Sequence, residues 1–376
     1  MRIRSLDIWV LNLTFRYPFR HKLATHAASQ NLVVGVRTAA GLRGFGEGVP
    51  RSFVTGETLE RSVTWLKETL GPAVLAHDFP TPEAFRPIFL TWWDTLGGEA
   101  APGAFCALET ALLDAAGRTF SRSLGEFLGP PHHAPLRYSA VLPLSAGPQL
   151  AQFFTQVKAL GVGQVKLKVG EDNDLETLAQ ARRELGEEVD LRVDANGAWR
   201  ADEAIRRIRE MEPFRVSLVE QPVPKEDVEG LARVQEAVAV PVMADEAVCT
   251  LAEARRLIEL RACRLFNLRL SKMGGLTQTR RIYELAREAG ISCQLGCQVG
   301  ETSILAAAGR HFACTTPGLA YLEGSYAPFL LREDPVATPL GFGPGGAAPP
   351  LTGPGLGLEV REDLLHQLAT IHITIP

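Results

Sequence analysis

Apolar and charged residues alternate in blocks along the chain from about residue 137 onward. The charged blocks carry apolar residues every three or four positions, which predicts amphipathic helices, and the short apolar runs between them predict β-strands. The order strand, helix, strand predicts parallel strands joined by crossover helices, and eight such runs make a barrel. The eight runs span residues 137–144, 164–169, 190–195, 216–222, 240–246, 264–271, 291–296 and 318–324.

The two ends of the chain have a different pattern. The first 125 residues begin with β-rich runs and continue with helical stretches at 57–70 and 101–120, which is typical of an α+β domain. Residues 335–357 are rich in glycine and proline, which predicts a loop that returns over the surface before a last short element. We therefore expect an α+β domain at 1–125, a barrel at 126–334 and a closing segment at 335–376.

Five charged residues fall one barrel step apart: Lys168, Asp194, Glu220, Asp245 and Lys272. The steps between them are 26, 26, 25 and 27 residues, and each residue closes an apolar run. One strand, one helix and their connections consume about 25 residues, so equal steps place each residue at the same level of the next strand. The sequence therefore predicts that the five side chains share one rim of the barrel.

The three acids of this series end three adjacent strands. Neighbouring strands lie about 4.8 Å apart, so carboxylates at one level can converge on a hard cation. Capping of the following helix is the alternative, and for Asp194 by itself the two interpretations are equally supported. Three acids without a basic partner beside them repel one another unless a cation neutralises them. The pattern therefore favours a metal site, with Mg²⁺ as the ion.

Lys166 and Lys168 lie two positions apart in the strand VKLKV, so both side chains leave the same face. The apolar face must meet the helices, which turns the lysines towards the barrel interior; an edge strand with a solvated basic face is the alternative. An ammonium beside a dication and a second ammonium has a lowered pKa, which suits a general base. We expect Lys168 to be that base and Lys166 to hold a substrate carboxylate.

Lys272 closes the sixth run, which lies opposite the second run in a ring of eight strands. Amines on opposite sides of a bound substrate permit removal of a proton from one face and its return to the other. A surface lysine in the turn before Gly274 and Gly275 is the alternative.

Composition excludes several classes of partner. The net charge of −4 and the lack of a basic cluster exclude nucleic acid, and no run approaches the ~18 apolar residues of a membrane span. Asp7 and Asn12 interrupt the N-terminal apolar stretch, so it predicts a first strand rather than a signal peptide. The six cysteines are scattered, which predicts reduced thiols in the cytoplasm; Cys293 and Cys297, four residues apart, are a weak zinc signal because no histidine accompanies them.

The strings KLKVG, VDANGAW, VEQP, ADEAV and LSKMGG together resemble the barrel signature of the enolase superfamily, in its muconate lactonising enzyme subgroup. GFGEGVP, TGET and LGLEVREDLL are similar to that subgroup's capping domain and closing segment. The resemblance implies an α/β fold: a modified (β/α) TIM-type barrel with an N-terminal α+β capping domain that the C-terminal segment completes. It also implies a small-molecule carboxylate substrate and a homo-oligomer.

The resemblance assigns roles to particular residues. The three strand-end acids would bind Mg²⁺, with Asn196 supporting them. Lys168 and Lys272 would be acid/base catalysts that abstract a proton α to a carboxylate and stabilise an enediolate. We expect Glu301 beside Lys272, with capping of the following helix as the alternative. The substrate-binding residues expected from the barrel and capping loops are Gln298, Glu301, Glu323, Ser325, His21, Arg51 and Phe53.

Two departures narrow the choice within the superfamily. The mandelate racemase branch carries histidines on its second and seventh strands, whereas here the second run has none and the seventh ends in Gly296, with Cys297 and Gln298 after it. Dipeptide epimerases usually carry an Asp-x-Asp pair after the eighth strand that binds the substrate ammonium, but this chain has Glu323-Gly324-Ser325. A single carboxylate would pair an amine more weakly, and Glu323 as a surface acid is the alternative.

The leading hypothesis is a Mg²⁺-dependent isomerase that racemises or epimerises the carbon α to a carboxylate, in an amino-acid derivative or a dipeptide. The second hypothesis is a muconate-type cycloisomerase or an o-succinylbenzoate synthase-like lyase, either of which needs only one of the two lysines. The third is a non-catalytic barrel that acts as a binding protein.

Overall fold

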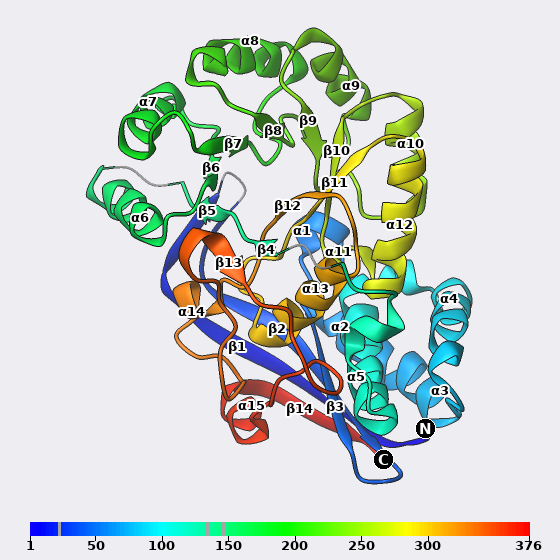
Figure 1. Ribbon diagram of the computed structural model, residues 1–376. Helices are drawn as coiled ribbons and strands as arrows, with labels where there is room; N and C mark the ends of the chain where they lie inside the picture. Colours follow the sequence, from blue (N-terminus) through cyan, green and yellow to red (C-terminus); the bar gives the residue numbers. More distant parts are fainter. Residues whose placement is uncertain (22–23, 133–134, 145–146) are drawn as a thin grey trace.

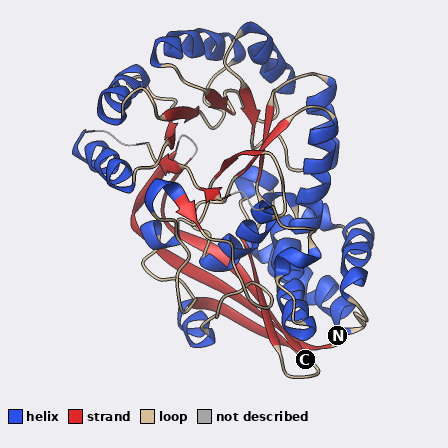
Figure 2. Cartoon of the chain, viewed as in Figure 1, coloured by secondary structure: helices blue, strands red, loops and turns tan. Residues whose placement is uncertain are grey.

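The computed structural model describes residues 1–21, 24–132, 135–144 and 147–376. A curled sheet of parallel strands is surrounded by helices, and an antiparallel sheet with its own helices lies beside it (Figures 1 and 2). The predicted fold class, a modified barrel with an α+β capping domain, is confirmed. No helix in the described ranges is both long and apolar enough to cross a bilayer.

Eight strands build the barrel, and each pairs in parallel with the next one along the chain. The two edges of this sheet are brought together by a hydrogen bond: the backbone N–H of Ser139, just before β5, donates to the Leu322 carbonyl at the end of β12 over 2.8 Å. The strands are β5 (Ala140–Leu142), β6 (Gln164–Lys168), β7 (Asp190–Asp194), β8 (Leu218–Glu220), β9 (Val242–Ala244), β10 (Leu265–Leu268), β11 (Ser292–Leu295) and β12 (Leu319–Leu322).

Amphipathic helices cover the outside of the barrel, as the block pattern predicts. In α8, for example, Ala204, Ile208 and Met211 are buried at helical spacing while the arginines between them reach solvent. The helices are α6 (Gly147–Leu160), α7 (Asp174–Leu185), α8 (Ala201–Met211), η5 (Glu212–Phe214), α9 (Val228–Ala237), α10 (Leu251–Glu259), α11 (Leu270–Met273), α12 (Leu276–Glu288), α13 (Ser303–Cys314) and α14 (Ala327–Leu330).

The capping domain contains a four-stranded antiparallel sheet in the order β14-β1-β2-β3. The last strand of the chain, β14 (Ala369–Ile375), pairs with the first, β1 (Ile3–His21), so both termini lie at the same end of this domain (Figure 1). The other strands are β2 (Ala24–Thr38) and β3 (Arg43–Gly48). The boundaries at residues 125 and 334 stay a prediction.

Helices pack on this sheet and in the closing segment. They are α1 (Ser52–Thr55), α2 (Leu59–Trp65), the π-helical turn η1 (Leu66–Leu70), α3 (Gly71–Leu75), η2 (Pro82–Ala84), α4 (Phe85–Thr95), η3 (Gly98–Ala100), α5 (Pro102–Phe120), η4 (Leu124–Phe127), η6 (Pro344–Gly346) and α15 (Glu362–Leu368). Glycines on β3 let α5 approach the sheet closely: a Cβ on Gly46 would lie 2.1 Å from the Ala107 carbonyl oxygen.

Two details differ from the sequence prediction. The first apolar run is split, because β4 (Leu136–Arg137) leaves the barrel to pair with β13 (Ala347–Ala348), and only β5 joins the ring. The sixth run is shorter than predicted: β10 ends at Leu268, and Lys272 lies in the single-turn helix α11, which Gly274 ends in a left-handed conformation.

Candidate active site

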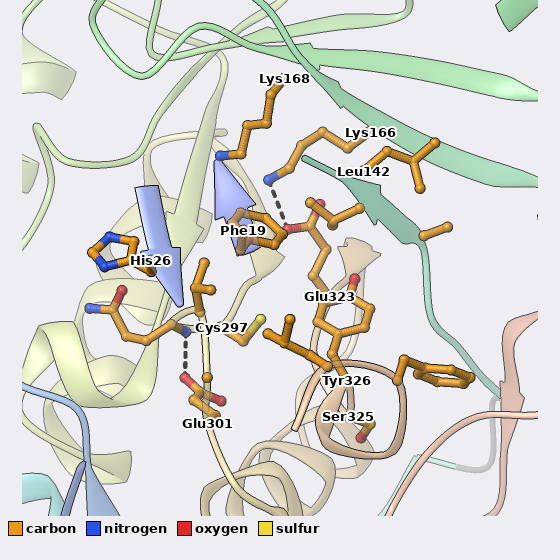
Figure 3. A pocket seen from close by; sticks show the side chains of 18 of the residues that line it. Phe19, His26, Leu142, Lys166, Lys168, Cys297, Glu301, Glu323, Ser325 and Tyr326 are labelled. Atoms are coloured by element: carbon orange, nitrogen blue, oxygen red, sulfur yellow. Dashed lines mark hydrogen bonds and ion pairs between the residues drawn. The ribbon is translucent and has the colours of Figure 1, made fainter. Parts of the chain in front are cut away.

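A pocket lies between the carboxyl ends of the barrel strands and the edge of the capping domain (Figure 3). Lys166 and Lys168 point into it from β6, and Glu323 faces Lys166 from the end of β12. The capping domain lines the pocket with Tyr17, Phe19, His26, Arg51 and Phe53.

The two lysines of β6 are buried inside the ring, because alternate side chains of the strand point to opposite faces. The Lys166 ammonium donates to Glu220 over 2.7 Å and to Glu323 over 2.8 Å. The Lys168 ammonium donates to Asp194, and also to the Asn196 amide oxygen over 2.9 Å. Neither side chain lies on a solvated edge strand, so that alternative is wrong.

The three strand-end acids are fully buried and lie on successive strands. The strand registers place Lys168 beside Asp194 and Asp194 beside Glu220. Each acid has a basic partner: Lys168 for Asp194, Lys166 for Glu220, and both Arg269 and Lys272 for Asp245. The assumption that the acids lack basic partners was therefore wrong, because the partners come from neighbouring strands rather than from adjacent sequence.

The acids suit a hard cation by their chemistry, since carboxylate oxygens are the ligands that Mg²⁺ prefers. Glu246, next to Asp245, adds a buried carboxylate oxygen that has no hydrogen-bond partner. Within the described residues, however, no three acid, histidine or cysteine side chains are grouped as a ready metal site, because ammonium and guanidinium groups bind the acids. The metal-binding role of the acids therefore stays a prediction.

Lys272 is buried, so its interpretation as a surface lysine is wrong. Its ammonium donates to the Asp245 carbonyl over 2.6 Å, to the Asp245 carboxylate over 2.9 Å and to the Asn267 carbonyl over 2.9 Å. Burial, with the Arg269 charge nearby, lowers the pKa of Lys272 to about 8. Arg269 lines the pocket and Lys272 does not, so the two catalytic lysines of the prediction are not equally placed.

Lys166 is held in its charged form. Burial disfavours the ammonium, but Glu220, Glu323 and Asp194 outweigh burial and raise the pKa of Lys166 above its usual value. Burial likewise disfavours the Glu220 carboxylate, and Lys166 reverses the effect, so the pKa of Glu220 lies below its usual value. In its charged form Lys166 can attract a substrate carboxylate.

Glu323 is 5% exposed, so it is not a surface acid. Its carboxylate contacts Lys166 at 2.8 Å and Arg192 at 3.2 Å. Those two cations outweigh burial, and the pKa of Glu323 lies below its usual value. Ser325 lies in the pocket wall with φ of 55°, and its hydroxyl accepts a hydrogen bond from Arg310 over 3.0 Å.

The remaining predicted residues lie around the pocket mouth. Glu301 accepts a hydrogen bond from the backbone N–H of Gln298, and its charged neighbours are Glu47, Arg269 and Arg51 rather than Lys272. The helix after it is capped by Thr302, so neither expectation for Glu301 matches its contacts. The Gln298 side chain accepts from Arg269 over 3.0 Å.

The residues predicted in the capping domain make different contacts. Arg51 donates to the Val299 carbonyl over 2.9 Å, which ties the capping domain to the barrel loop after β11. The Phe53 ring stacks on His26 at 6.1 Å. The side chain of His21 lies outside the described residues.

Several site residues were missed in the sequence. Asn267 lies on β10 and donates to Glu220, and Arg269 lies just after β10 and contacts Asp245. Arg192 precedes Asp194 by two positions, so it points into the same ring one layer lower. The spacing of two residues from Asp194 could have indicated in the sequence that Arg192 faces the ring. The position of Arg269 at the end of the sixth apolar run could have indicated that it lies at the rim.

The fold and the site define a barrel enzyme whose strand-end acids and lysines lie under an α+β capping domain. Comparison with known proteins gives its family. The chain matches the family description "Mandelate racemase / muconate lactonizing enzyme, N-terminal domain" over residues 5–129 and "Enolase C-terminal domain-like" over 149–364. The chain therefore belongs to the mandelate racemase/muconate lactonizing enzyme family of the enolase superfamily, and it is an isomerase.

Three similar proteins show how far the likeness extends. The N-succinyl-L-Arg/Lys racemase of Bacillus cereus is 27% identical over 98% of this chain and 98% of its own. The L-Ala-D/L-Glu epimerase of Clostridium acetobutylicum is 31% identical over 82% of this chain and 86% of its own. The structure of the Cytophaga hutchinsonii dipeptide epimerase, complexed with Mg and the dipeptide D-Ala-L-Val, superimposes with a TM-score of 0.90 at 26% identity and covers 100% of both chains.

Proposed function

We propose that this protein is a Mg²⁺-dependent racemase or epimerase that exchanges the proton α to a carboxylate in an amino-acid derivative. The observation that carries the proposal is the buried pair Lys166 and Lys168, which points into the pocket beside three strand-end carboxylates. The related epimerase structure that contains Mg supports the choice of metal, and the related N-succinyl-L-Arg/Lys racemase supports an amino-acid derivative as the substrate.

Asp194, Glu220 and Asp245 would hold the ion. Bound Mg²⁺ supplies positive charge that stabilises the negative charge developing on the substrate carboxylate. Lys166, which its acidic neighbours keep charged, adds an electrostatic contact to the same carboxylate. Asn196 positions Lys168, because its amide oxygen accepts from the Lys168 ammonium while its amide nitrogen donates to Glu246 over 3.0 Å.

Lys168, in its neutral form, would remove the α proton. The C–H bond breaks, the proton moves to the Lys168 amine, and the electron pair stays on the substrate as an enediolate. Lys272 would return a proton to the opposite face, which inverts the carbon. Its ammonium must first turn from the Asp245 and Asn267 oxygens towards the pocket.

One observation favours a second candidate. Because Lys272 does not line the pocket, a reaction that needs a single base is also consistent with the geometry. A muconate-type cycloisomerisation is such a reaction.

Proton exchange distinguishes the two candidates. In D₂O with Mg²⁺, a two-base racemase should incorporate deuterium at the α carbon of both enantiomers of an N-acyl amino acid. Lys168→Ala should abolish exchange of one enantiomer, and Lys272→Ala should abolish exchange of the other. If neither enantiomer of any N-acyl amino acid or dipeptide exchanges its α proton, the proposal is wrong.

The homo-oligomer and the cytoplasmic location that the family resemblance implies stay predictions. Sedimentation velocity of the full chain tests the first, and fractionation of the host cell tests the second.

A further inference from the structure

Glu323, at the end of β12, is paired with two cationic side chains of the protein. Its carboxylate lies between the Lys166 ammonium at 2.8 Å and the Arg192 guanidinium at 3.2 Å. The contact with Arg192 is an attraction between charges rather than an aligned hydrogen bond, since the Arg192 nitrogen and the Glu323 oxygen concerned have no hydrogen-bond partner. Glu323 is therefore held between two cations.

The Arg192 cation cannot easily move away. It is fully buried, its guanidinium lies 3.9 Å over the Tyr321 ring, and it donates to the Gln294 side chain. Opposite charges at this burial stay paired, because separating them leaves an uncompensated charge away from water. Glu323 thus remains a counter-ion for Lys166 and Arg192 when a ligand enters.

Apart from Glu246, the other described polar groups near this end of the pocket offer a ligand no unengaged carboxylate. Two residues after Glu323, the uncharged Ser325 accepts from the Arg310 guanidinium. Glu301 accepts from the Gln298 backbone, and the charges of Arg269 and Arg51 lie near it. One Glu246 oxygen accepts from Asn196 and the other has no hydrogen-bond partner, but this carboxylate lies beside the Lys168 and Asp194 charges, among the reacting groups.

The remaining wall of the pocket is apolar. It combines the capping strand β1, the first barrel strand and its helix, and the segment after β12, which all converge on the same space (Figure 3). The apolar lining residues are Tyr17, Phe19, Leu142, Phe153, Val157, Leu160, Phe329, Leu330 and Phe342. A large apolar group gains free energy by leaving water for such a wall, whereas an ammonium loses its hydration without gaining a partner.

We infer that the pocket takes an N-acylated amino acid with a large apolar substituent and rejects a dipeptide with a free amino terminus. This inference rests on the proposed function, since it names the substrate class for the same site. Glu323 is a positioning residue in this account: it orients Lys166 and does not touch the substrate amine.

Two ligands of nearly equal shape test the inference. N-propionyl-L-phenylalanine and glycyl-L-phenylalanine differ only in a terminal methyl group where the dipeptide has an ammonium. At pH 7, with the holoenzyme in saturating Mg²⁺, calorimetry gives the affinity for each ligand and deuterium incorporation gives kcat/KM. We expect the propionyl ligand to be preferred at least about tenfold in both measurements. Equal affinities, or a preference for the glycyl ligand, would overturn the inference.

Two variants identify which acid is involved. If Glu323 bound the ammonium, Glu323→Gln would weaken the glycyl ligand selectively. We expect instead that Glu323→Gln lowers kcat/KM for both ligands, keeps their ratio within about threefold and shifts the pH profile, because Lys166 loses a counter-ion. Glu301→Gln should leave the ratio equally unchanged. A selective loss of the glycyl ligand in either variant contradicts the inference.

Failure of the substrate class and failure of the proposed reaction give different results. If the propionyl ligand binds more tightly but neither ligand exchanges its α proton, the substrate class stands and the proposed reaction fails. If both exchange and the glycyl ligand is preferred, the reaction stands and the substrate class is wrong.

Discussion

Glu109 provides a test of how the capping domain is joined to the barrel. It lies on α5 of the capping domain, is 1% exposed, and accepts a hydrogen bond from the Thr277 backbone N–H over 3.0 Å at the start of barrel helix α12. The N-cap position of α12 is Gly275, which has no side chain, so a carboxyl from the other domain satisfies this helix end. Burial raises the pKa of Glu109 from 4.5 to about 7.

The sign of the effect on stability follows from proton binding. Below pH 4.5 both the folded and the unfolded protein carry a protonated Glu109. Between pH 4.5 and about 7 the unfolded chain loses this proton while the folded protein keeps it, so stability falls as pH rises. At about 1.4 kcal/mol for each pH unit, the total loss is roughly 3 kcal/mol. Glu109→Gln keeps an acceptor oxygen for Thr277 and removes the titration.

Urea unfolding from pH 4.5 to 8.5 measures this effect. The free energy of unfolding of Glu109→Gln minus that of the unaltered protein should rise by roughly 3 kcal/mol up to pH 7 and then stay constant. Glu109→Ala is the matched control: it should show the same rise, offset downward by about 1–2 kcal/mol because the helix loses its cap. A difference that does not change with pH refutes the reasoning.

Three further predictions concern packing, capping and the metal. Gly46→Ala should lower the free energy of unfolding by about 3 kcal/mol or more in thermal unfolding, because its Cβ would meet the α5 backbone. Gly163→Ala, where a Cβ has open space, should lower it by less than about 1 kcal/mol. Similar losses for the two variants would contradict the packing account. Glu57→Ala should cost about 2–3 kcal/mol, because Glu57 accepts two backbone N–H groups at the start of α5, and a loss under about 1 kcal/mol would contradict this. Chelation with EDTA should abolish α-proton exchange and added Mg²⁺ should restore it, so exchange that survives chelation would exclude the metal role.

Much of the fold and part of the site could be predicted from the sequence. The barrel step works because every strand and helix of such a unit uses a similar number of residues, so Lys168, Asp194 and Glu220 each end their strand. The period of two in β6 was sufficient to bring Lys166 and Lys168 into the ring. Both are local rules that the rest of the chain does not alter.

The partners of these residues could not be predicted in the same way. Arg192 and Glu323 are 131 positions apart, and their contact depends on how the ring closes between β5 and β12. Lys272 shows a second limit of prediction from the sequence. The strand ends at Leu268 and a single turn of helix follows, so Lys272 lies off the strand end, and Arg269 lines the pocket in its place. A periodic pattern gives the face of a residue, but not which charge from another strand will meet it.

The most direct test of the account is a crystal structure of the protein with Mg²⁺ and N-propionyl-phenylalanine. The account predicts that Asp194, Glu220 and Asp245 bind the ion, that the ligand carboxylate lies beside Lys166, and that Lys168 and Lys272 face opposite sides of the α carbon. An ion bound elsewhere, or an α carbon beyond the reach of Lys168, would contradict it.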